Sequence, residues 1–271
     1  MRVGFIGLGS QGGPMARAIV DAGFHTTLWA RRPASLEPYA DTAAKTAGSP
    51  AELGAASDLV CICVVGDADV EEVLGGDNGV LAGMTDGGVV AIHSTVHPDT
   101  CRELAQIAAA QGVSLIDAPV SGGAPAVAEK RLLVMAGGDE DVVERCRPVF
   151  ETYGSHVHLG PLGSGQVTKL LNNLLFTANL GNAKSALQLG EALGVSAASL
   201  ADVLTRGSGN SAALGSIAAM GGSLDVLKQV AGALLQKDVR LVLDIAQKAD
   251  VTAGAVLDAA DAALELLEHP R

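Results

Sequence analysis

The sequence is poor in aromatic residues and in positive charge. Phe, Trp and Tyr together make up 3% of the 271 residues, too few for a surface on which nucleic acid bases would stack. Lys and Arg number 18 against 30 Asp and Glu, which gives a formal net charge of −12 at pH 7. Because this negative charge opposes binding to phosphate backbones and anionic lipid, we expect neither nucleic acid nor a membrane among the partners.

Cysteines and long apolar runs are also scarce. The four cysteines, Cys61, Cys63, Cys101 and Cys146, form no Cys-x-x-Cys motif and no Cys/His cluster, so we expect reduced thiols in the core and no bound metal. No stretch has the roughly 18 uninterrupted apolar residues of a membrane span, and no leader-like segment stands ahead of the first apolar run. These absences predict a soluble cytoplasmic protein.

What the chain has in quantity is apolar residues, at 48%, and glycine, at 34 residues. Its length suits two domains of ~100 to 200 residues each. Up to residue 160, short apolar runs alternate with segments of helical composition, and a run such as 59–65 is apolar on both faces, as in parallel strands covered on each side. We therefore predict that residues 1–160 form a doubly wound α/β Rossmann domain. The apolar runs lie at residues 3–6, 26–29, 59–65, 89–92, 113–116 and 132–135.

Residues 161–271 contain no strand-like run and are predicted to form an all-helical domain. Residues 165–193 have the pattern of a single helix, roughly 44 Å long at 1.5 Å per residue, which would suit an interdomain helix. Apolar residues recur at helical spacing further on, within 234–246 and 256–267. Because a domain of only ~110 residues has little core of its own, we expect a homodimer or higher homo-oligomer to bury part of these helices.

A G-x-G-x-x-G motif lies between the first predicted strand and the following helix, the context of a dinucleotide-binding turn. Its first glycine permits the turn, the second lets the backbone approach a pyrophosphate, and the third lets helix and strand pack. The alternative is a merely tight turn in a glycine-rich chain; the position favours the dinucleotide site. The six residues assigned to the cofactor are Gly7, Leu8, Gly9, Ser10, Gln11 and Gly12.

The end of the second apolar run lacks the acidic residue that an NAD site places on the ribose hydroxyls, and Arg31 and Arg32 stand there instead. Guanidinium groups bind a 2′-phosphate through charge-assisted hydrogen bonds. We therefore predict NADP as the preferred cofactor, with NAD as the alternative, and Arg31 as the better candidate of the two; the competing interpretation is a pair of solvated surface charges. Val64 and Val65, at the end of the third run, are assigned to the same cofactor site.

Four ordered motifs resemble the β-hydroxyacid dehydrogenase family, which includes 3-hydroxyisobutyrate dehydrogenase and tartronate semialdehyde reductase. The glycine motif continues as Gly-Pro-Met-Ala, with Gln11 in place of the family's usual Met. Residues 117–123 (DAPVSGG) match the family's substrate-binding signature, and residues 160–173 (GPLGSGQVTKLLNN) match its catalytic one. With Ser94-Thr95 ahead of a proline, and with Lys237-Asp238, the resemblance covers nearly the whole chain.

Lys169 and Asn173 are four residues apart, so on a helix an amine and an amide project from one face. A partly desolvated lysine can exchange a proton with a substrate oxygen. The family resemblance implies that Lys169 is the general acid when a carbonyl is reduced and the general base when an alcohol is oxidised, with Asn173 orienting it and the substrate. The competing interpretation of Lys169 is a solvated lysine on a long helix.

The segment Ser121-Gly122-Gly123 offers a hydroxyl and unobstructed backbone N–H groups, which suit a carboxylate. The resemblance implies that these three residues hold the substrate carboxylate. It also implies that Thr95 lies by the nicotinamide ribose, and that Lys237 reaches cofactor and substrate from a helical domain like that of 6-phosphogluconate dehydrogenase. A plain loop and a helix-surface charge are the competing interpretations.

The implied activity is an NADP-preferring interconversion of a small β-hydroxyacid and its semialdehyde or keto form by hydride transfer. Two alternatives stay open. Imine reductases resemble this family in fold and cofactor loop but usually have Asp or Tyr where this chain has Lys169. A non-catalytic NADP-binding module is the other, and an intact Lys169 with Asn173 disfavours it.

Two features depart from the family's pattern. Lys130, next to Arg131, stands where family members usually have glycine, so we expect either an altered turn or an added charge near the active site. The carboxy-terminal region is slightly shorter than usual, so we expect a more open pocket wall. His93 and His97 flank the Ser94-Thr95 pair, yet no further ligands stand at workable spacing. We therefore expect them to be structural or loop histidines.

Overall fold

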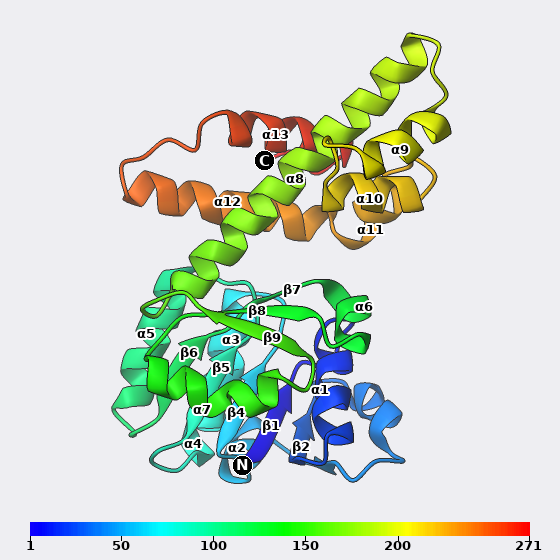
Figure 1. The fold of residues 1–271 in the computed structure, drawn as a ribbon. Coiled ribbons are helices and arrows are strands. Elements are labelled where there is room, and N and C mark those ends of the chain that lie inside the picture. Colours follow the sequence, from blue (N-terminus) through cyan, green and yellow to red (C-terminus); the bar gives the residue numbers. More distant parts are fainter. The chain divides into compact units, whose positions relative to one another are not determined.

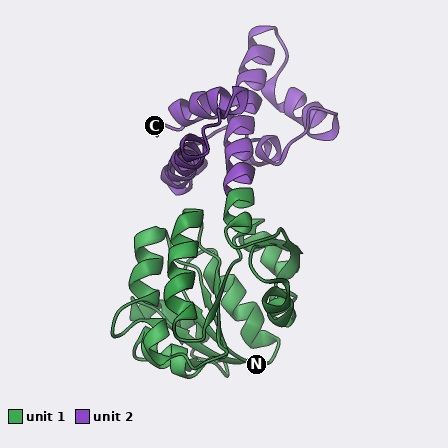
Figure 2. Ribbon diagram, turned by 90° about the vertical axis from the view of Figure 1, so that its left-hand side faces the viewer, with its two compact units in different colours: residues 1–169 green, residues 170–271 purple.

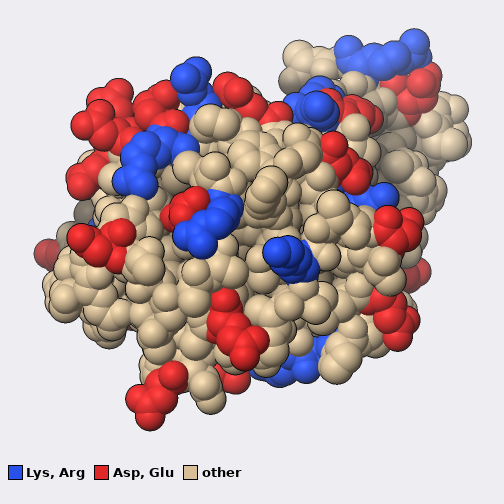
Figure 3. All heavy atoms as spheres, turned by 90° about the horizontal axis from the view of Figure 1, so that it is seen from below, with Lys and Arg blue, Asp and Glu red and all other residues tan.

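The computed structural model describes residues 1–271, and the chain divides into two compact units, residues 1–169 and 170–271 (Figure 2). Two apolar clusters lie in the first unit and one in the second. None of the helices combines the length and the apolar character needed to cross a membrane. On the face seen in Figure 3, Lys and Arg are dispersed among Asp and Glu rather than gathered into one basic surface.

The first unit is built on a six-stranded parallel sheet with the strand order β3-β2-β1-β4-β5-β6 (Figure 1). Five of the six predicted apolar runs form strands of this sheet, which confirms the predicted α/β class. The strands are β1 (Arg2–Ile6), β2 (His25–Trp29), β3 (Lys45–Thr46), β4 (Leu59–Ile62), β5 (Val89–Ile92) and β6 (Ser114–Asp117).

Helices cover both faces of this sheet, as the two-sided apolar runs predict. Along β4, Leu59 and Cys61 belong to one buried cluster and Val60 and Ile62 to the other, because successive side chains of a strand point to opposite faces. One face is covered by α1 (Gly12–Asp21) and α7 (Glu140–Phe150), and the other by α2 (Pro50–Ala55), α3 (Asp67–Leu74), α4 (Val80–Gly83) and α5 (Pro98–Ala109). The segment after β2 forms the 3₁₀-helix η1 (Pro33–Tyr39).

The sixth apolar run lies in a separate sheet, with the strand order β7-β8-β9, which differs from the expectation of a single sheet. This sheet consists of β7 (Val120–Ser121), β8 (Leu132–Ala136) and β9 (Gly154–His158), with α6 (Gly123–Ala128) between the first two strands. Strand β7 is antiparallel to β8, and β9 is parallel to it. A bridge between Asp117 and Gly137 joins this sheet to the end of β6.

The second unit contains only helices, as predicted. Helix α8 (Ser164–Ala192) has 29 residues and lies one residue earlier than the predicted 165–193. It is followed by α9 (Ala197–Arg206), α10 (Ala212–Ala219), α11 (Asp225–Val230), α12 (Gly232–Lys248) and α13 (Ala255–Leu266). The core includes Leu235 and Val239 of α12 together with Ala260 and Leu264 of α13, at the predicted helical spacing.

The compact units meet inside α8, after Lys169, whereas the sequence pattern changes at residue 160. The reason lies in the first turn of α8, which is held by the first unit through hydrogen bonds described below. The first six residues of α8 therefore belong to the first unit and the others to the second.

Candidate active site

Two glycines of the turn after β1 are required by the fold. Gly7 has φ +96°, and a Cβ there would lie 2.1 Å from the carbonyl oxygen of Cys63. At Gly12, where α1 begins, a Cβ would lie 2.0 Å from the carbonyl oxygen of Gly7. Both positions need glycine because β1, α1 and the end of β4 approach one another closely.

Gly9 has another reason to be glycine. A Cβ at Gly9 would meet no protein atom within 4 Å, and its φ is not positive, so neither packing nor backbone conformation requires glycine there. Ser10 beside it is exposed, and Gln11 precedes α1 without a side-chain capping bond. A helix N-terminus behind a turn that carries no side chain at Gly9 fits the pyrophosphate of a dinucleotide.

The carboxyl ends of β4 and β5 are joined beside this turn. The backbone N–H of Val64 donates to Ser94 Oγ at 2.8 Å, which fixes the loop that carries Thr95. Val65 is 67% exposed, and Thr95 is half-buried. Because the strand order reverses between β1 and β4 (Figure 1), these ends border the crevice where doubly wound folds bind ligands.

Arg31 and Arg32 follow β2 and are both exposed. Arg31 Nη2 donates to Asp69 Oδ1 at 3.0 Å and to Glu72 Oε2 at 2.8 Å, both on α3. Arg32 precedes η1 as its N-cap residue. Of the two arginines, Arg31 therefore reaches toward the crevice between β1 and β4, while Arg32 stands at the start of η1.

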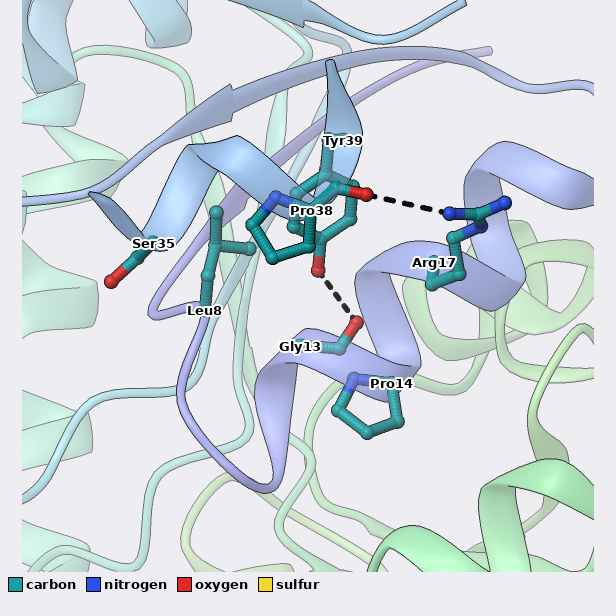
Figure 4. Close-up of a pocket in the computed structure, with 7 residues that line it drawn as sticks. All are labelled: Leu8, Gly13, Pro14, Arg17, Ser35, Pro38 and Tyr39. Atoms are coloured by element: carbon teal, nitrogen blue, oxygen red, sulfur yellow. Dashed lines mark hydrogen bonds between the residues drawn. The ribbon is translucent and has the colours of Figure 1, made fainter. Parts of the chain in front are cut away.

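Leu8 lies in a pocket between the glycine turn, α1 and η1 (Figure 4). Tyr39 donates its hydroxyl to the carbonyl of Gly13 at 2.7 Å, and Arg17 Nη1 donates to the carbonyl of Pro38 at 3.4 Å, so η1 is tied to α1. No Lys, His, Asp or Glu is among the lining residues. Leu8 therefore contributes packing here, and the Tyr39 hydroxyl is engaged in tying η1 to α1.

The Ser-Gly-Gly segment forms the turn between β7 and α6. Gly122 has φ +125° and Gly123 has φ +68°, conformations that side chains rarely adopt, and Ser121 is partly exposed. Further along, Lys130 is exposed with φ +53°, so the position where family members usually carry glycine does adopt a left-handed backbone. Lys130 bears the strain of that turn, of the order of 1–2 kcal/mol.

Asp117, at the end of β6, holds the start of α8. Its carboxylate is fully buried and accepts the backbone N–H of Gly163 on Oδ1 and of Gln166 on Oδ2, both at 2.7 Å. Burial raises the pKa of this carboxyl, and the two N–H donors act in the opposite direction. The carboxyl group accepts these bonds at the N-terminus of a long helix, where the helix dipole favours negative charge.

Gln166 connects the same turn of α8 to the loop after β5. Its side chain is fully buried, with Nε2 donating to the carbonyl of Ser94 at 2.8 Å and Oε1 accepting the N–H of Val96 at 3.1 Å. Thr95 thus lies between two residues that are both bonded to Gln166. This side chain fixes the first turn of α8 to the loop assigned to the nicotinamide ribose.

Lys169 stands three residues after Gln166, within the first unit. Burial raises the pKa of the Cys63 thiol to about 12, and the nearby Lys169 ammonium acts in the opposite direction. Cys63 directly follows β4 and its carbonyl faces Gly7. The Lys169 ammonium therefore acts electrostatically on the residue that ends the β4 run, and the backbone of that residue contacts the glycine turn.

In the second unit, Asp238 orients Asn173. Asn173 lies one helical turn after Lys169 on α8, and its Nδ2 donates to Asp238 Oδ2 at 2.6 Å. Asp238 is buried on α12, and its Oδ1 lies 3.3 Å from the ammonium of Lys237. The structure thus joins Asn173 and Lys237, predicted separately, through one carboxylate.

The histidines beside Thr95 have structural partners. His93 is buried, with Nδ1 2.6 Å from the carbonyl of Ala118 and Nε2 3.2 Å from the Tyr153 hydroxyl. His97 caps α5 by accepting the N–H of Asp99. All four cysteines are free, and the structure contains no group of three His, Cys, Asp or Glu side chains suited to a metal.

Five residues of the site have contacts that the sequence patterns do not predict: Asp69, Glu72, Asp117, Gln166 and Asp238. Asp117 and Gln166 stand inside the motifs quoted above, and for Asp117 the available signal was a charged residue within an apolar stretch. Asp238 adjoins Lys237 in the fourth motif. The two α3 acids carry no such signal, because their distance along the chain from Arg31 hides the contact.

Two family models match the chain. Residues 2–161 match the model described as the NAD-binding domain of 6-phosphogluconate dehydrogenase. Residues 163–268 match the model described as NAD-binding of NADP-dependent 3-hydroxyisobutyrate dehydrogenase. Together they cover both predicted parts of the chain in the predicted order.

Individual relatives agree with these matches. A 3-hydroxyisobutyrate dehydrogenase of Pseudomonas aeruginosa is 34% identical over 213 residues, 78% of this chain and 72% of the relative. A solved Mycobacterium tuberculosis 3-hydroxyisobutyrate dehydrogenase with L-serine has a TM-score of 0.85 at 29% identity, covering 99% of this chain and 94% of that one.

A Streptomyces aurantiacus imine reductase shares the fold, with a TM-score of 0.70 at 22% identity, covering 99% of this chain and 98% of that one. At that identity, the similarity concerns the fold alone. The family models and the first two relatives confirm the resemblance drawn from the motifs. The chain belongs to the 3-hydroxyisobutyrate dehydrogenase-like β-hydroxyacid dehydrogenase family and is an NAD(P)-dependent oxidoreductase of that family.

Proposed function

We propose that the protein interconverts a small β-hydroxyacid and its semialdehyde or keto form, with NADP as the preferred cofactor and Lys169 as the general acid and base. The observation that carries this proposal is the anchoring of the first turn of α8. Asp117 and Gln166 fix that turn against the ends of β5 and β6, and Lys169 follows directly. An amine carried by an anchored helical turn suits proton exchange with a substrate oxygen.

Each side chain then has a defined task. A bound nicotinamide supplies or accepts the hydride. Lys169 donates a proton to the carbonyl oxygen during reduction and removes one from the hydroxyl during oxidation. Asn173, held by Asp238, orients the amine and the substrate, and Lys237 assists from α12.

The remaining residues bind rather than react. The turn formed by Ser121, Gly122 and Gly123 holds the substrate carboxylate through a hydroxyl and backbone N–H groups. Thr95, in the loop fixed by Gln166, lies at the nicotinamide ribose. The cofactor's phosphates and adenosine take the glycine turn, Arg31, Arg32 and the end of β4; the full cofactor set is Gly7, Leu8, Gly9, Ser10, Gln11, Gly12, Arg31, Arg32, Val64, Val65, Thr95 and Lys237.

Relatives indicate the size of the substrate. The similar proteins named above are 3-hydroxyisobutyrate dehydrogenases, one of them solved with L-serine. Both compounds carry a hydroxyl on the carbon next but one to a carboxylate. We therefore infer that this chain accepts small acids of that kind, or the matching semialdehydes.

A homodimer is also part of the proposal. Large apolar side chains of the second unit remain exposed, among them Leu189 at 61% on α8, Val203 at 60% on α9 and Val230 at 65% on α11. Exposed apolar surface of this kind favours association between copies.

The test is the Lys169→Ala variant. We expect NADPH affinity to stay nearly unchanged while turnover falls by roughly 10² to 10⁴, the loss typical of a missing acid–base group. Calorimetry measures the binding, and absorbance of the reduced nicotinamide measures the turnover. Lys45→Ala, on exposed β3, is the control and should keep both values. Equal turnover in Lys169→Ala and the parent would remove Lys169 from the mechanism.

A further inference from the structure

The ion pairs of Arg31 lie across the cofactor crevice. Arg31 extends from the end of β2, whereas Asp69 and Glu72 stand on α3, which follows β4. Strand β1 separates β2 from β4 in the sheet. Arg31 Nη2 therefore joins the β2 side of the crevice to the β4 side, because it lies 3.0 Å from Asp69 Oδ1 and 2.8 Å from Glu72 Oε2.

The two acids form a compact negative site. They are three residues apart on α3, so they share one face of the helix. Asp67, at the start of the same helix, is engaged elsewhere: its Oδ1 accepts the N–H of His97 at 2.7 Å and the hydroxyl of Thr100 at 2.8 Å. Asp69 and Glu72 are thus the acids of α3 that contact Arg31.

A 2′-phosphate at Arg31 would compete with these carboxylates. The phosphate carries a charge of about −1.5 to −2 at neutral pH, and the guanidinium has to exchange at least one carboxylate for it. The displaced carboxylate would stay close to the phosphate and repel it. A cofactor with a 2′-hydroxyl brings no such charge and meets no such repulsion.

We propose that Asp69 and Glu72 are specificity-determining residues that limit the preference for NADPH by holding Arg31 and repelling the 2′-phosphate. The inference rests on the proposed assignment of Arg31 to that phosphate. This role would explain why Arg31, placed where NADP enzymes need an arginine, is bound by two carboxylates of α3. Neutralising the two acids should convert a modest preference for NADPH into a strong one.

The experiment measures dissociation constants of NADPH and NADH by calorimetry for the parent and for the double variant Asp69→Asn, Glu72→Gln. We expect NADPH to bind about three- to tenfold more tightly to the variant, the size expected when two exposed charge interactions change. NADH should change less than twofold. The matched control is Glu71→Gln, an exposed acid of α3 that is not a partner of Arg31, and it should change neither constant.

Two results would overturn the inference: unchanged or weaker NADPH binding in the double variant, or an equal gain for NADPH and NADH, which would indicate general relief of charge at the pyrophosphate. Arg31→Ala separates this inference from the proposed function. A selective loss of NADPH binding in Arg31→Ala, with no effect of the acid variant, would refute only the role of Asp69 and Glu72. A parallel loss for both cofactors in Arg31→Ala would refute the 2′-phosphate assignment itself.

Discussion

Gly7 and Gly9 belong to the same motif, but glycine is needed at the two positions for different reasons. Only Gly7 combines a positive φ with a close backbone contact. We predict that Gly9→Ala leaves the free energy of unfolding nearly unchanged and weakens NADPH and NADH alike by at least about tenfold, or ~1.4 kcal/mol. Gly7→Ala should lower the free energy of unfolding, by at least 1–3 kcal/mol for the strained backbone alone.

Urea denaturation and cofactor titration of the two variants check this contrast. A Gly9→Ala protein that binds cofactor like the parent would show that the pyrophosphate does not approach this turn.

His93 makes the stability of the first unit depend on pH. Burial lowers the pKa of His93 from 6.5 to about 4. At a pH between these two pKa values, the imidazole of His93 is protonated in the unfolded chain but stays neutral in the folded chain. The free energy of unfolding therefore falls as the pH falls. The expected loss from this group is about 3 kcal/mol at 1.36 kcal/mol per pKa unit.

Denaturation curves at several pH values between 7 and 4 measure this loss. Carboxylates also contribute over that range, so the parent is compared with His93→Gln, which cannot be protonated. The parent should lose more stability than the variant on acidification. Parallel curves would mean that His93 has the same pKa in the folded and the unfolded chain.

Single residues were predictable from the sequence where local geometry decides them. The glycine turn depends on neighbours within the same segment, so its context was sufficient. Arg31 was recognisable as a cation at the end of a strand, but its partners Asp69 and Glu72 lie about 40 residues away in sequence. Only the folded sheet brings α3 to β2, and no local pattern shows that.

At the scale of elements, the start of α8 is held by one buried carboxylate. In Asp117→Asn an amide nitrogen would replace one of the two acceptors and would face the N–H of Gly163 or Gln166. An unsatisfied buried donor costs about 1–3 kcal/mol, so we predict a loss of stability of this size together with lower turnover.

Urea denaturation measures the first effect, and turnover at saturating substrate measures the second. Asp139→Asn is the matched control, because Asp139 precedes α7 without a side-chain capping bond. A variant Asp117→Asn with the parent's stability and turnover would show that the carboxylate does not hold the helix.

Elements were predictable where the apolar pattern is continuous. Helix α8 and strands β1, β4 and β5 have such patterns and lie within a few residues of their predicted positions. Strand β9 alternates partly buried and exposed residues around two histidines, and β3 and β7 have two residues each. Pairing with neighbouring strands, rather than their own composition, makes these three segments extended.

At the scale of the whole molecule, the chain combines a dinucleotide-binding unit with a helical unit that carries Asn173, Asp238 and Lys237. The sequence motifs were sufficient to predict this order and the family, because each motif keeps its spacing within one segment. The identity of the substrate was not predictable from the sequence, because residues from several separate elements would contact the part of the substrate that varies. Cofactor preference is likewise decided by contacts between elements.

The most direct test of the account follows the absorbance of NADPH, and then of NADH, when the purified protein meets tartronate, methylmalonate and succinate semialdehydes and one cyclic imine. We predict that at least one semialdehyde oxidises NADPH, and does so faster than it oxidises NADH, and that Lys169→Ala abolishes most of this turnover. Turnover of the imine alone would contradict it in favour of an imine reductase. Bound NADPH with no reaction in either direction, hydroxyacids included, would instead indicate a non-catalytic module.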